Sequence, residues 1–175
     1  MEPYLGVIAL FDPETNHKFD QLNQILKRAG IKTIDIPPHL TLGIYQSVAV
    51  NELSKWLEQV CTGRKRIKLS LNHIGMFGAE VLFLAPKVTR ELLSLHESLH
   101  ARYDDCHGEV GVHYSLKSNN FVPHASLVVN DTEQVLKAVP VVIDNFHPIQ
   151  GEIAAVGLYT FYPMKQLQVF ELEPW

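Results

Sequence analysis

The sequence has little cysteine and no long apolar run. Its 175 residues include 2 cysteines, Cys61 and Cys106, too few for a disulfide framework, which favours a reducing compartment. Its apolar runs are much shorter than the roughly 20 residues of a membrane span. The first residues, Met1 to Tyr4, lack the basic start and small-residue cleavage site of a signal peptide. We therefore expect a cytoplasmic protein with no membrane partner.

An excess of basic charge is also missing. The chain has 15 Lys plus Arg against 19 Asp plus Glu, a formal net charge of -4. Proteins that follow a long nucleic acid usually carry a basic stripe. The one basic cluster, Arg64-Lys65-Arg66 with Lys68, is more typical of a solvated strand entry. We expect no extended nucleic-acid surface, whereas a small nucleotide or a short RNA end stays open as a ligand.

The length fits one domain, or two small lobes that share a core. Periodicity and breakers predict strands at 4–11, 39–45, 67–71, 81–85, 122–129, 149–161 and 166–172, with Gly75 to Gly78 ending the third. They predict helices at 14–29, 51–61 and 89–103, and a short one from about 131 to 136. The order strand, helix, strand, helix, strand occurs twice.

This repeated order predicts an α+β fold of two pseudo-symmetric lobes, each with antiparallel sheet and helices, and an active-site cleft between them. We expect a single bilobal domain over residues 1–175, with lobe 1 at roughly 1–78 and lobe 2 at roughly 79–175. The sequence predicts no oligomeric state.

Two segments nearly repeat each other, Ile36–Ile44 and Phe121–Val129. Both read apolar, x, Pro, His, x, Ser or Thr, Leu, x, apolar. The shorter pattern His-x-[Ser/Thr]-Leu is weak by itself, because it also occurs at His96 and His113. Only the two repeats have the preceding proline and the following apolar strand, so they are the candidate site.

Each repeat places an imidazole and a hydroxyl on one face of a strand, because residues two apart share a face. The pairs are His39 with Thr41 and His124 with Ser126. Two imidazoles can act as general base and general acid in one reaction, since their unperturbed pKa lies close to neutrality. The two hydroxyls can hold an anionic group between them. The same alternation places Tyr45 on the face of His39, where it can stack on a base.

With these motifs the chain resembles the 2H phosphoesterase superfamily, the LigT-like or 2′-5′ RNA ligase-like proteins, over nearly its whole length. That family carries two His-x-[Ser/Thr]-apolar motifs, one in each lobe. The resemblance implies a cofactor-free, metal-independent phosphodiesterase that acts on a 2′,3′-cyclic phosphate or a 2′-5′ phosphodiester of RNA or a small nucleotide. Reverse RNA ligation would use the same groups. It implies that His39 and His124 are catalytic and that Thr41 and Ser126 bind the phosphate.

Other positions adjust this expectation. Some RNA-acting relatives place a basic residue shortly after the second motif, where this chain has Val128 and Asn130 on the expected site face. This departure favours a small nucleotide over a long RNA. Tyr162 lies at the tip of the last predicted hairpin, where relatives often bring an aromatic side chain toward the site. Phe11 is a further candidate for substrate binding, although its place in the first strand is more typical of core.

A rival pattern is His96-Glu97-Ser98-Leu99-His100, which matches H-E-x-x-H. On a helix it would place two zinc ligands on one face, with Glu97 as general base of a hydrolase. Cys106 stands at the position of a third ligand in the long form of that motif. We instead expect an amphipathic helix whose His96 and His100 lie on a polar or partly exposed face. A third alternative is a non-catalytic nucleotide- or RNA-binding module, against which the two complete motifs argue.

Overall fold

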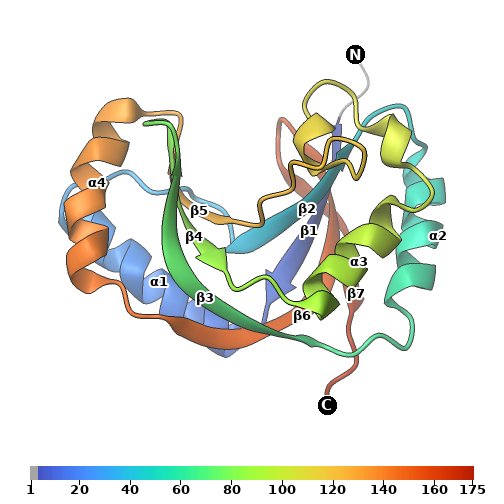
Figure 1. Cartoon of the computed structure of the whole chain (residues 1–175), viewed down its shortest axis with the longest axis horizontal. Helices are drawn as coiled ribbons and strands as arrows, with labels where there is room; N and C mark the ends of the chain where they lie inside the picture. The colour runs from blue at the N-terminus through green and yellow to red at the C-terminus, as the bar shows by residue number, and fades with distance from the viewer. Residues whose placement is uncertain (1–3) are drawn as a thin grey trace.

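Residues 4–175, which the computed structural model describes, form seven strands, four α-helices and two short 3-10 helices (Figure 1). The strands are β1 (Tyr4–Phe11), β2 (His39–Tyr45), β3 (Ile67–Phe77), β4 (Val81–Pro86), β5 (Ala125–Val129), β6 (Ile149–Phe161) and β7 (Lys165–Glu171). The helices are α1 (Pro13–Arg28), α2 (Val50–Cys61), α3 (Arg90–His100), α4 (Thr132–Asn145), η1 (Asp104–Cys106) and η2 (Val112–Tyr114). The α+β class is confirmed.

The strands form one antiparallel sheet in the order β2-β1-β6-β3-β4-β5, and β7 pairs with β6. The long strand β6 is shared: Ile149–Ile153 pair with β3, and Ile153–Phe161 pair with β1. β2 and β5 stand at the two ends of this order, yet they contact each other, so the sheet is strongly curved (Figure 1). The curvature brings together the two strands that carry the His-x-[Ser/Thr] motifs.

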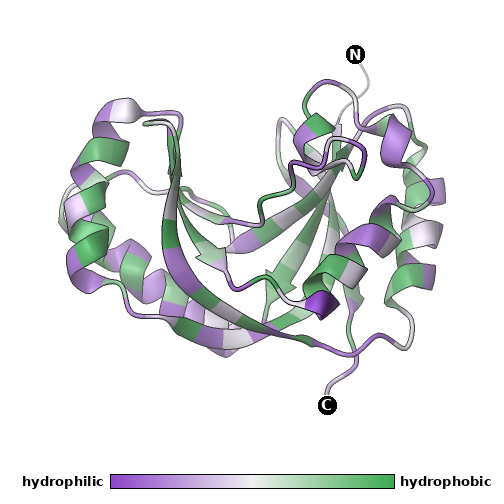
Figure 2. Ribbon diagram, in the orientation of Figure 1, coloured by the Kyte–Doolittle hydropathy of each residue, from purple (hydrophilic) through white to green (hydrophobic). Residues whose placement is uncertain are grey.

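The helices pack in pairs outside this curved sheet. α1 contacts α4 on one side of the molecule, and α2 contacts α3 on the other (Figure 1). Hydrophobic and hydrophilic residues alternate along each helix, as expected for helices with one buried face (Figure 2). Each pair combines helices from both halves of the chain. The lobe boundary near residue 78 remains a prediction.

The hydrogen-bond register contains a bulge directly after the first motif. Thr41 pairs with Ile8 of β1, and Gly43 pairs with the preceding residue, Val7. Leu42 therefore has no partner of its own and is the extra residue of a β-bulge. Because Ile8 and Val7 point to opposite faces of β1, Thr41 and Gly43 lie on opposite faces of the sheet.

The second motif has the same bulge at the same place. Ser126 pairs with Phe83 of β4, and Val128 pairs with Leu82, so that Leu127 is the extra residue. The two motifs are therefore equivalent in hydrogen-bond geometry as well as in sequence. This agreement supports the pseudo-symmetry that the repeated order predicted.

Four element boundaries differ from the prediction by three residues or more. α3 ends at His100 rather than near residue 103. β3 does not end near Gly75 but continues to Phe77, because the β3–β4 ladder extends to the turn. α4 continues to Asn145 through Pro140, a residue that normally ends a helix. β5 begins at Ala125, so His124 directly precedes the strand.

Among residues 4–175, the helices are too short or too polar to cross a bilayer.

Candidate active site

The two motif histidines are held in the same way. His39 donates a hydrogen bond from Nδ1 to the carbonyl oxygen of Pro37 at 2.8 Å. His124 donates one from Nδ1 to the carbonyl oxygen of Val122, also at 2.8 Å. Because a carbonyl oxygen only accepts, each Nδ1 carries the proton. In both neutral rings Nε2 is then the unprotonated nitrogen, able to accept or return a proton.

The two imidazoles also influence each other. Burial lowers the pKa of His39, and the positive charge of a protonated His124 lowers it further. Burial likewise lowers the pKa of His124. The strands β2 and β5 that follow or carry these rings contact each other, and the charge of His124 reaches His39, although the residues are 85 positions apart in the sequence (39 and 124). The repeats therefore meet at one two-histidine site.

The hydroxyls of the motifs lie on the same faces as the histidines. His39 pairs with Leu10 and Thr41 with Ile8, two alternating positions on one face of β1. Ser126 lies opposite Phe83, whose ring centroid is 5.1 Å from that of His124. Each motif therefore presents an imidazole and a hydroxyl together, as the spacing predicts.

Tyr45 does not belong to this face, and its expected role in base stacking is wrong. The bulge at Leu42 reverses the alternation, so Gly43 and Tyr45 lie opposite Thr41. Tyr45 is fully buried, and its hydroxyl lies 3.3 Å from Nδ1 of His100. The bulge at Leu127 has the same effect on Val128 and Asn130, which leave the face of Ser126.

The other two aromatic candidates differ. Phe11 is buried in the hydrophobic core, so its expected contact with a substrate is also wrong. Tyr162, in the turn between β6 and β7, has 79% of its surface exposed. Tyr114 lies close enough to both Tyr162 and Thr41 for them to affect its pKa, which burial raises. Tyr162 therefore remains a candidate for substrate binding.

The H-E-x-x-H histidines are structural residues in this fold. His96 donates from Nε2 to the carbonyl of Tyr114 at 2.8 Å, and His100 donates from Nε2 to the carbonyl of Leu42 at 2.9 Å. Both side chains are buried rather than partly exposed as expected, because α3 packs against β2 and the segment after η1. Glu97 is exposed on the other face of the helix. With Nε2 of each ring donating to a backbone carbonyl, only Nδ1 is left to bind a metal, and Nδ1 of His100 already lies 3.0 Å from the Asp104 carboxylate.

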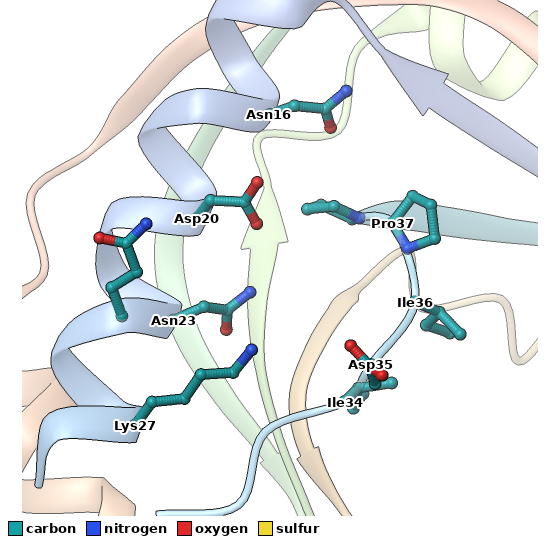
Figure 3. A pocket seen from close by; sticks show the side chains of 10 residues that line it. Asn16, Asp20, Asn23, Lys27, Ile34, Asp35, Ile36 and Pro37 are labelled. Carbon is teal, nitrogen blue, oxygen red and sulfur yellow. The ribbon is translucent and has the colours of Figure 1, made fainter.

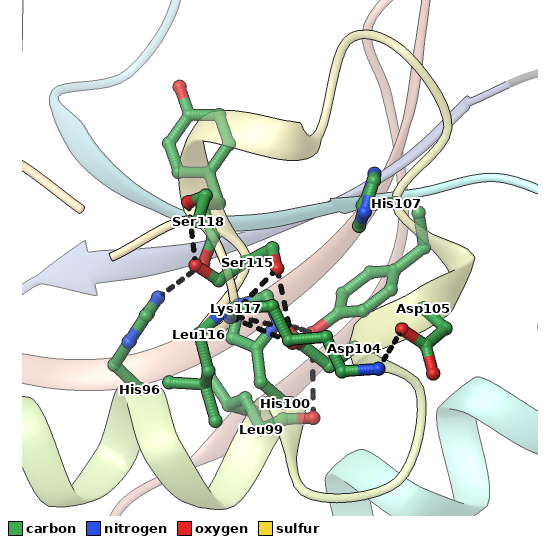
Figure 4. A network of polar contacts seen from close by, with 12 residues as sticks. His96, Leu99, His100, Asp104, Asp105, His107, Ser115, Leu116, Lys117 and Ser118 are labelled. Carbon is green, nitrogen blue, oxygen red and sulfur yellow. Dashed lines mark hydrogen bonds and ion pairs between the residues drawn. The ribbon is translucent and has the colours of Figure 1, made fainter. Parts of the chain in front are cut away.

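These histidines belong to a polar network that anchors the chain between α3 and β5 (Figure 4). Asp104 is its centre: its carboxylate lies 3.0 Å from Nδ1 of His100 and accepts hydrogen bonds from the backbone of Leu116 and Lys117 and from the Ser115 hydroxyl. Burial opposes ionisation, but these hydrogen bonds lower the pKa of Asp104 overall. The network fixes the segment that carries Tyr114.

His100 also satisfies a backbone carbonyl that the bulge in β2 leaves outside the ladder. A bulged residue leaves a carbonyl outside the regular ladder, and a buried carbonyl without a donor is costly. His100 satisfies the carbonyl of Leu42, and the backbone N–H of Ile34 donates to the equivalent carbonyl of Leu127 at 3.3 Å. Both copies of the motif therefore have a partner for the oxygen that the bulge exposes.

Sequence reasoning missed two neighbours of the site. Tyr114 lies in a segment that reads as a polar insert, and only the folded network reveals its contact with Thr41. Phe77 was expected in a turn, yet its ring centroid is 4.9 Å from that of His124. One signal in the sequence could have placed Phe77 on a strand: it follows the alternation of apolar and polar residues that begins at Ile67, and it lies between Gly75 and Gly78.

A groove of about 490 Å³ lies between α1 and the segment 34–38 (Figure 3). Asn16, Asp20 and Lys27 line it from the helix, and Pro37 lines it from the segment. The motif histidines and hydroxyls do not line it. The groove thus adjoins the backbone that supports His39 without including the motif side chains.

Comparisons with known proteins agree with this geometry. The chain matches the family described as the 2′-5′ RNA ligase superfamily over residues 8–162. A search of curated proteins found no match. Among solved structures, E. coli LigT complexed with 3′-AMP is 18% identical, covers 97% of each chain and superposes with a TM-score of 0.63. TT0787 of Thermus thermophilus is 16% identical over 97% of each chain, with a TM-score of 0.67.

A more distant structure, Usb1 of Kluyveromyces marxianus, is 11% identical over 97% of this chain and 98% of that one, with a TM-score of 0.51. These identities show a shared fold, whereas the sequence match covers most of the chain and shows the family. The chain therefore belongs to the 2′-5′ RNA ligase superfamily and has the fold of LigT.

Proposed function

We propose that the protein is a metal-independent phosphodiesterase that opens a ribose 2′,3′-cyclic phosphate or cleaves a 2′-5′ phosphodiester. One observation carries the proposal: both imidazoles have Nδ1 bound to a backbone carbonyl two residues earlier. A fixed Nδ1–H tautomer leaves Nε2 as the reactive atom in both rings. Two reactive nitrogens beside two hydroxyls suit an acid–base reaction at phosphorus.

In the proposed step, Nε2 of one neutral histidine takes a proton from water as the water oxygen attacks phosphorus. A new P–O bond forms, and the bond from phosphorus to a ribose oxygen breaks. The other histidine, protonated at Nε2, gives its proton to that leaving oxygen. The products are a phosphomonoester and a free ribose hydroxyl. Ligation would use the same pair of histidines, with an RNA 5′-hydroxyl in place of water: its oxygen forms the new P–O bond, the bond from phosphorus to the ribose 3′ oxygen breaks, that oxygen takes the proton, and a 2′-5′ linkage remains.

Thr41 and Ser126 would donate hydrogen bonds to the nonbridging phosphate oxygens. Charge on these oxygens grows toward the transition state, and donors placed beforehand stabilise it. The matching bulges support this role, because they put the two hydroxyls at equivalent places in their ladders. The hydroxyls thus hold the phosphate between the two imidazoles.

A small nucleotide or an RNA end is the proposed substrate. E. coli LigT, which has the same fold, has been solved with 3′-AMP, with NADP+ and with ATP. The chain has an overall acidic balance, with a net charge of -4, whereas proteins that follow a long nucleic acid usually have an excess of basic residues. These points favour ligands of nucleotide size.

The test is hydrolysis of 2′,3′-cyclic nucleotides and of a cyclic-phosphate-ended RNA oligomer in excess EDTA. We expect turnover by the wild-type protein, and a loss of at least about a hundredfold in His39→Ala and in His124→Ala, the low end for general acid–base catalysis. His113→Ala is the matched control, because exposed His113 begins the same tetrapeptide pattern outside the site.

Near-normal turnover by either motif variant would remove that histidine from the mechanism. Activity that disappears in EDTA and returns with zinc would favour the H-E-x-x-H helix instead. Binding of nucleotides without turnover under both conditions would favour the binding-module alternative.

A further inference from the structure

An aromatic cluster surrounds His124. The ring of Phe77 meets the imidazole at a centroid distance of 4.9 Å and an interplanar angle of 89°. Phe83 lies 5.1 Å from the same imidazole and 4.6 Å from Phe77. The two phenylalanines differ in exposure: Phe83 is 4% exposed, whereas Phe77 is 41% exposed. The buried Phe83 therefore supports the rings of His124 and Phe77, and Phe77 offers an exposed aromatic surface beside the site.

The sheet register explains how this cluster forms. Ser126 of β5, Phe83 of β4 and Gly75 of β3 lie directly opposite one another in a row across three strands. A Cβ atom on Gly75 would lie 2.3 Å from the Phe83 ring, so only glycine lets that ring lie across β3. Phe77 is two residues beyond Gly75, and thus on the same face as Ser126.

The other half of the molecule has the same row without the exposed ring. Thr41 lies opposite Ile8, and Ile8 lies opposite Gly157 of β6. Tyr159, two residues beyond Gly157, is the counterpart of Phe77, but it is buried and donates its hydroxyl hydrogen to Gln166. At this pair of equivalent strand positions, only the one on the His124 side therefore carries an exposed aromatic ring.

Phe77 presents an exposed aromatic face beside the imidazole of His124, where a ligand held by the two histidines would lie next to it. Phe77 has no charge or hydrogen-bonding group, so its face selects a flat, neutral partner rather than an ion. Nucleobases are such partners, and stacking on an aromatic side chain is worth about 1–3 kcal/mol for each base. A base is also tethered to the ribose whose phosphate this site would hold.

We propose that Phe77 is the base-stacking residue of the two-histidine site, which makes the substrate a nucleoside phosphodiester rather than a base-free cyclic phosphate. This proposal rests on the proposed function for its phosphate chemistry. It adds a specificity determinant on the His124 side of the site.

The experiment compares adenosine 2′,3′-cyclic phosphate with glycerol 1,2-cyclic phosphate, which presents the same five-membered ring without a base. Phe77→Leu keeps apolar volume beside His124 and removes the aromatic face. We expect this variant to raise KM for the adenosine substrate about tenfold, with the kcat/KM for the glycerol substrate unchanged. Phe77→Trp should keep the wild-type KM, since its ring can still stack.

Met76→Ala is the matched control, because Met76 is the neighbouring residue, has a similar exposure of 39%, and faces the other side of β3. An equal fall in kcat for both substrates in Phe77→Leu, with KM unchanged, would overturn the proposal and leave Phe77 as a positioning residue for His124.

Calorimetry separates this proposal from the proposed function. If the wild type hydrolyses neither compound, the proposed function fails, and binding of 3′-AMP and of glycerol phosphate is then measured. Weaker binding of 3′-AMP alone in Phe77→Leu supports the base-stacking site without any turnover. Equal binding of 3′-AMP by the wild type and Phe77→Leu, or no binding by either, overturns it.

Discussion

At the scale of single residues, the two motif histidines differ from free histidine in one important property. Burial lowers the pKa of both, and each ring keeps its proton on Nδ1 when neutral. The mechanism needs one of them protonated and the other neutral. A site with two lowered pKa values meets this condition only in mildly acidic solution, before phosphate binds.

This condition sets the pH dependence of kcat/KM, which reports the free enzyme. Both groups titrate below the ordinary histidine value of 6.5. Above that pH the acid loses its proton, and below the lower pKa the base gains one. We expect a bell-shaped profile with its maximum below pH 6.5, recorded over a range in which fluorescence shows the protein folded. A plateau that persists above pH 7 would contradict assignment of the acid to His39 or His124.

The motif hydroxyls give a second prediction at this scale. Thr41→Val and Ser126→Ala should each lower kcat about a hundredfold, the lower range for loss of one donor to a developing oxyanion. Thr41→Ser and Ser126→Thr keep a hydroxyl and serve as matched controls. The measurement is steady-state hydrolysis of a 2′,3′-cyclic nucleotide. Equal activity of Thr41→Ser and Thr41→Val would show that the hydroxyl of Thr41 has no part in catalysis.

At the scale of elements, each motif hydroxyl lies in a row of three paired residues that ends in a glycine, Gly75 beyond Ser126 and Gly157 beyond Thr41, and the two glycines give a paired prediction. A Cβ atom on Gly75 would lie 2.3 Å from Phe83, and one on Gly157 would lie 2.5 Å from Tyr159. Overpacking of this kind typically costs about 1–3 kcal/mol of folding stability. We expect urea unfolding to show a loss of this size in Gly75→Ala and in Gly157→Ala.

The two variants should differ in activity. Phe83 contacts His124, so displacement of its ring in Gly75→Ala should also lower kcat. Tyr159 hydrogen-bonds to Gln166 instead, so its displacement in Gly157→Ala should lower the stability and leave kcat nearly unchanged. Gly157→Ala is thus the matched control for Gly75→Ala. Equal kcat values in these two variants would argue against support of His124 by Phe83.

Most elements could be predicted from the sequence, because hydrophobic periodicity and capping residues are local. Asp12, for example, accepts hydrogen bonds from the backbone of Glu14 and Thr15 and starts α1 close to the predicted position. The continuation of α4 through Pro140 could not be predicted in this way, because packing of the buried face of the helix outweighs the local penalty of proline.

The site was predictable only in part, because some of its features depend on contacts between strands rather than on local sequence. The pairs of His39 with Thr41 and of His124 with Ser126 follow from spacing within one strand. The bulges cannot be predicted from this spacing, because a residue is recognised as extra only when the strand is paired with its neighbour. Tyr45 was therefore assigned to the wrong face, and Phe77, which reaches His124 from another strand, was not identified.

At the scale of the whole molecule, buried histidines link folding stability to pH. Burial and the nearby charge of His100 lower the pKa of His96 to about 4, from an ordinary value of 6.5. Between these pH values the unfolded chain binds a proton that the folded chain excludes, so stability rises with pH across this window. His96 alone accounts for roughly 3 kcal/mol of stability lost between pH 6.5 and pH 4. The half-buried His39 and His124, whose pKa values are also lowered, act in the same direction.

The variant His96→Gln tests this linkage. Its amide can donate to the carbonyl of Tyr114, as His96 does, but it does not titrate. Urea unfolding of both proteins near pH 7 and near pH 4.5 should give a smaller loss of stability on acidification for the variant. Equal losses in the two proteins would show that other groups dominate the acid sensitivity.

The shared strand β6 has a consequence for how this fold changes over evolution. The two histidines are separated by a continuous series of hydrogen-bonded ladders that runs from β2 through β1, β6, β3 and β4 to β5. A ladder can shift only by whole residues, and a shift by one residue turns every side chain to the opposite face. The separation of the imidazoles therefore cannot drift gradually as mutations accumulate. Side chains around the site, such as Phe77 and Tyr162, can instead be replaced without any change of strand register, so we expect differences in substrate preference to arise there.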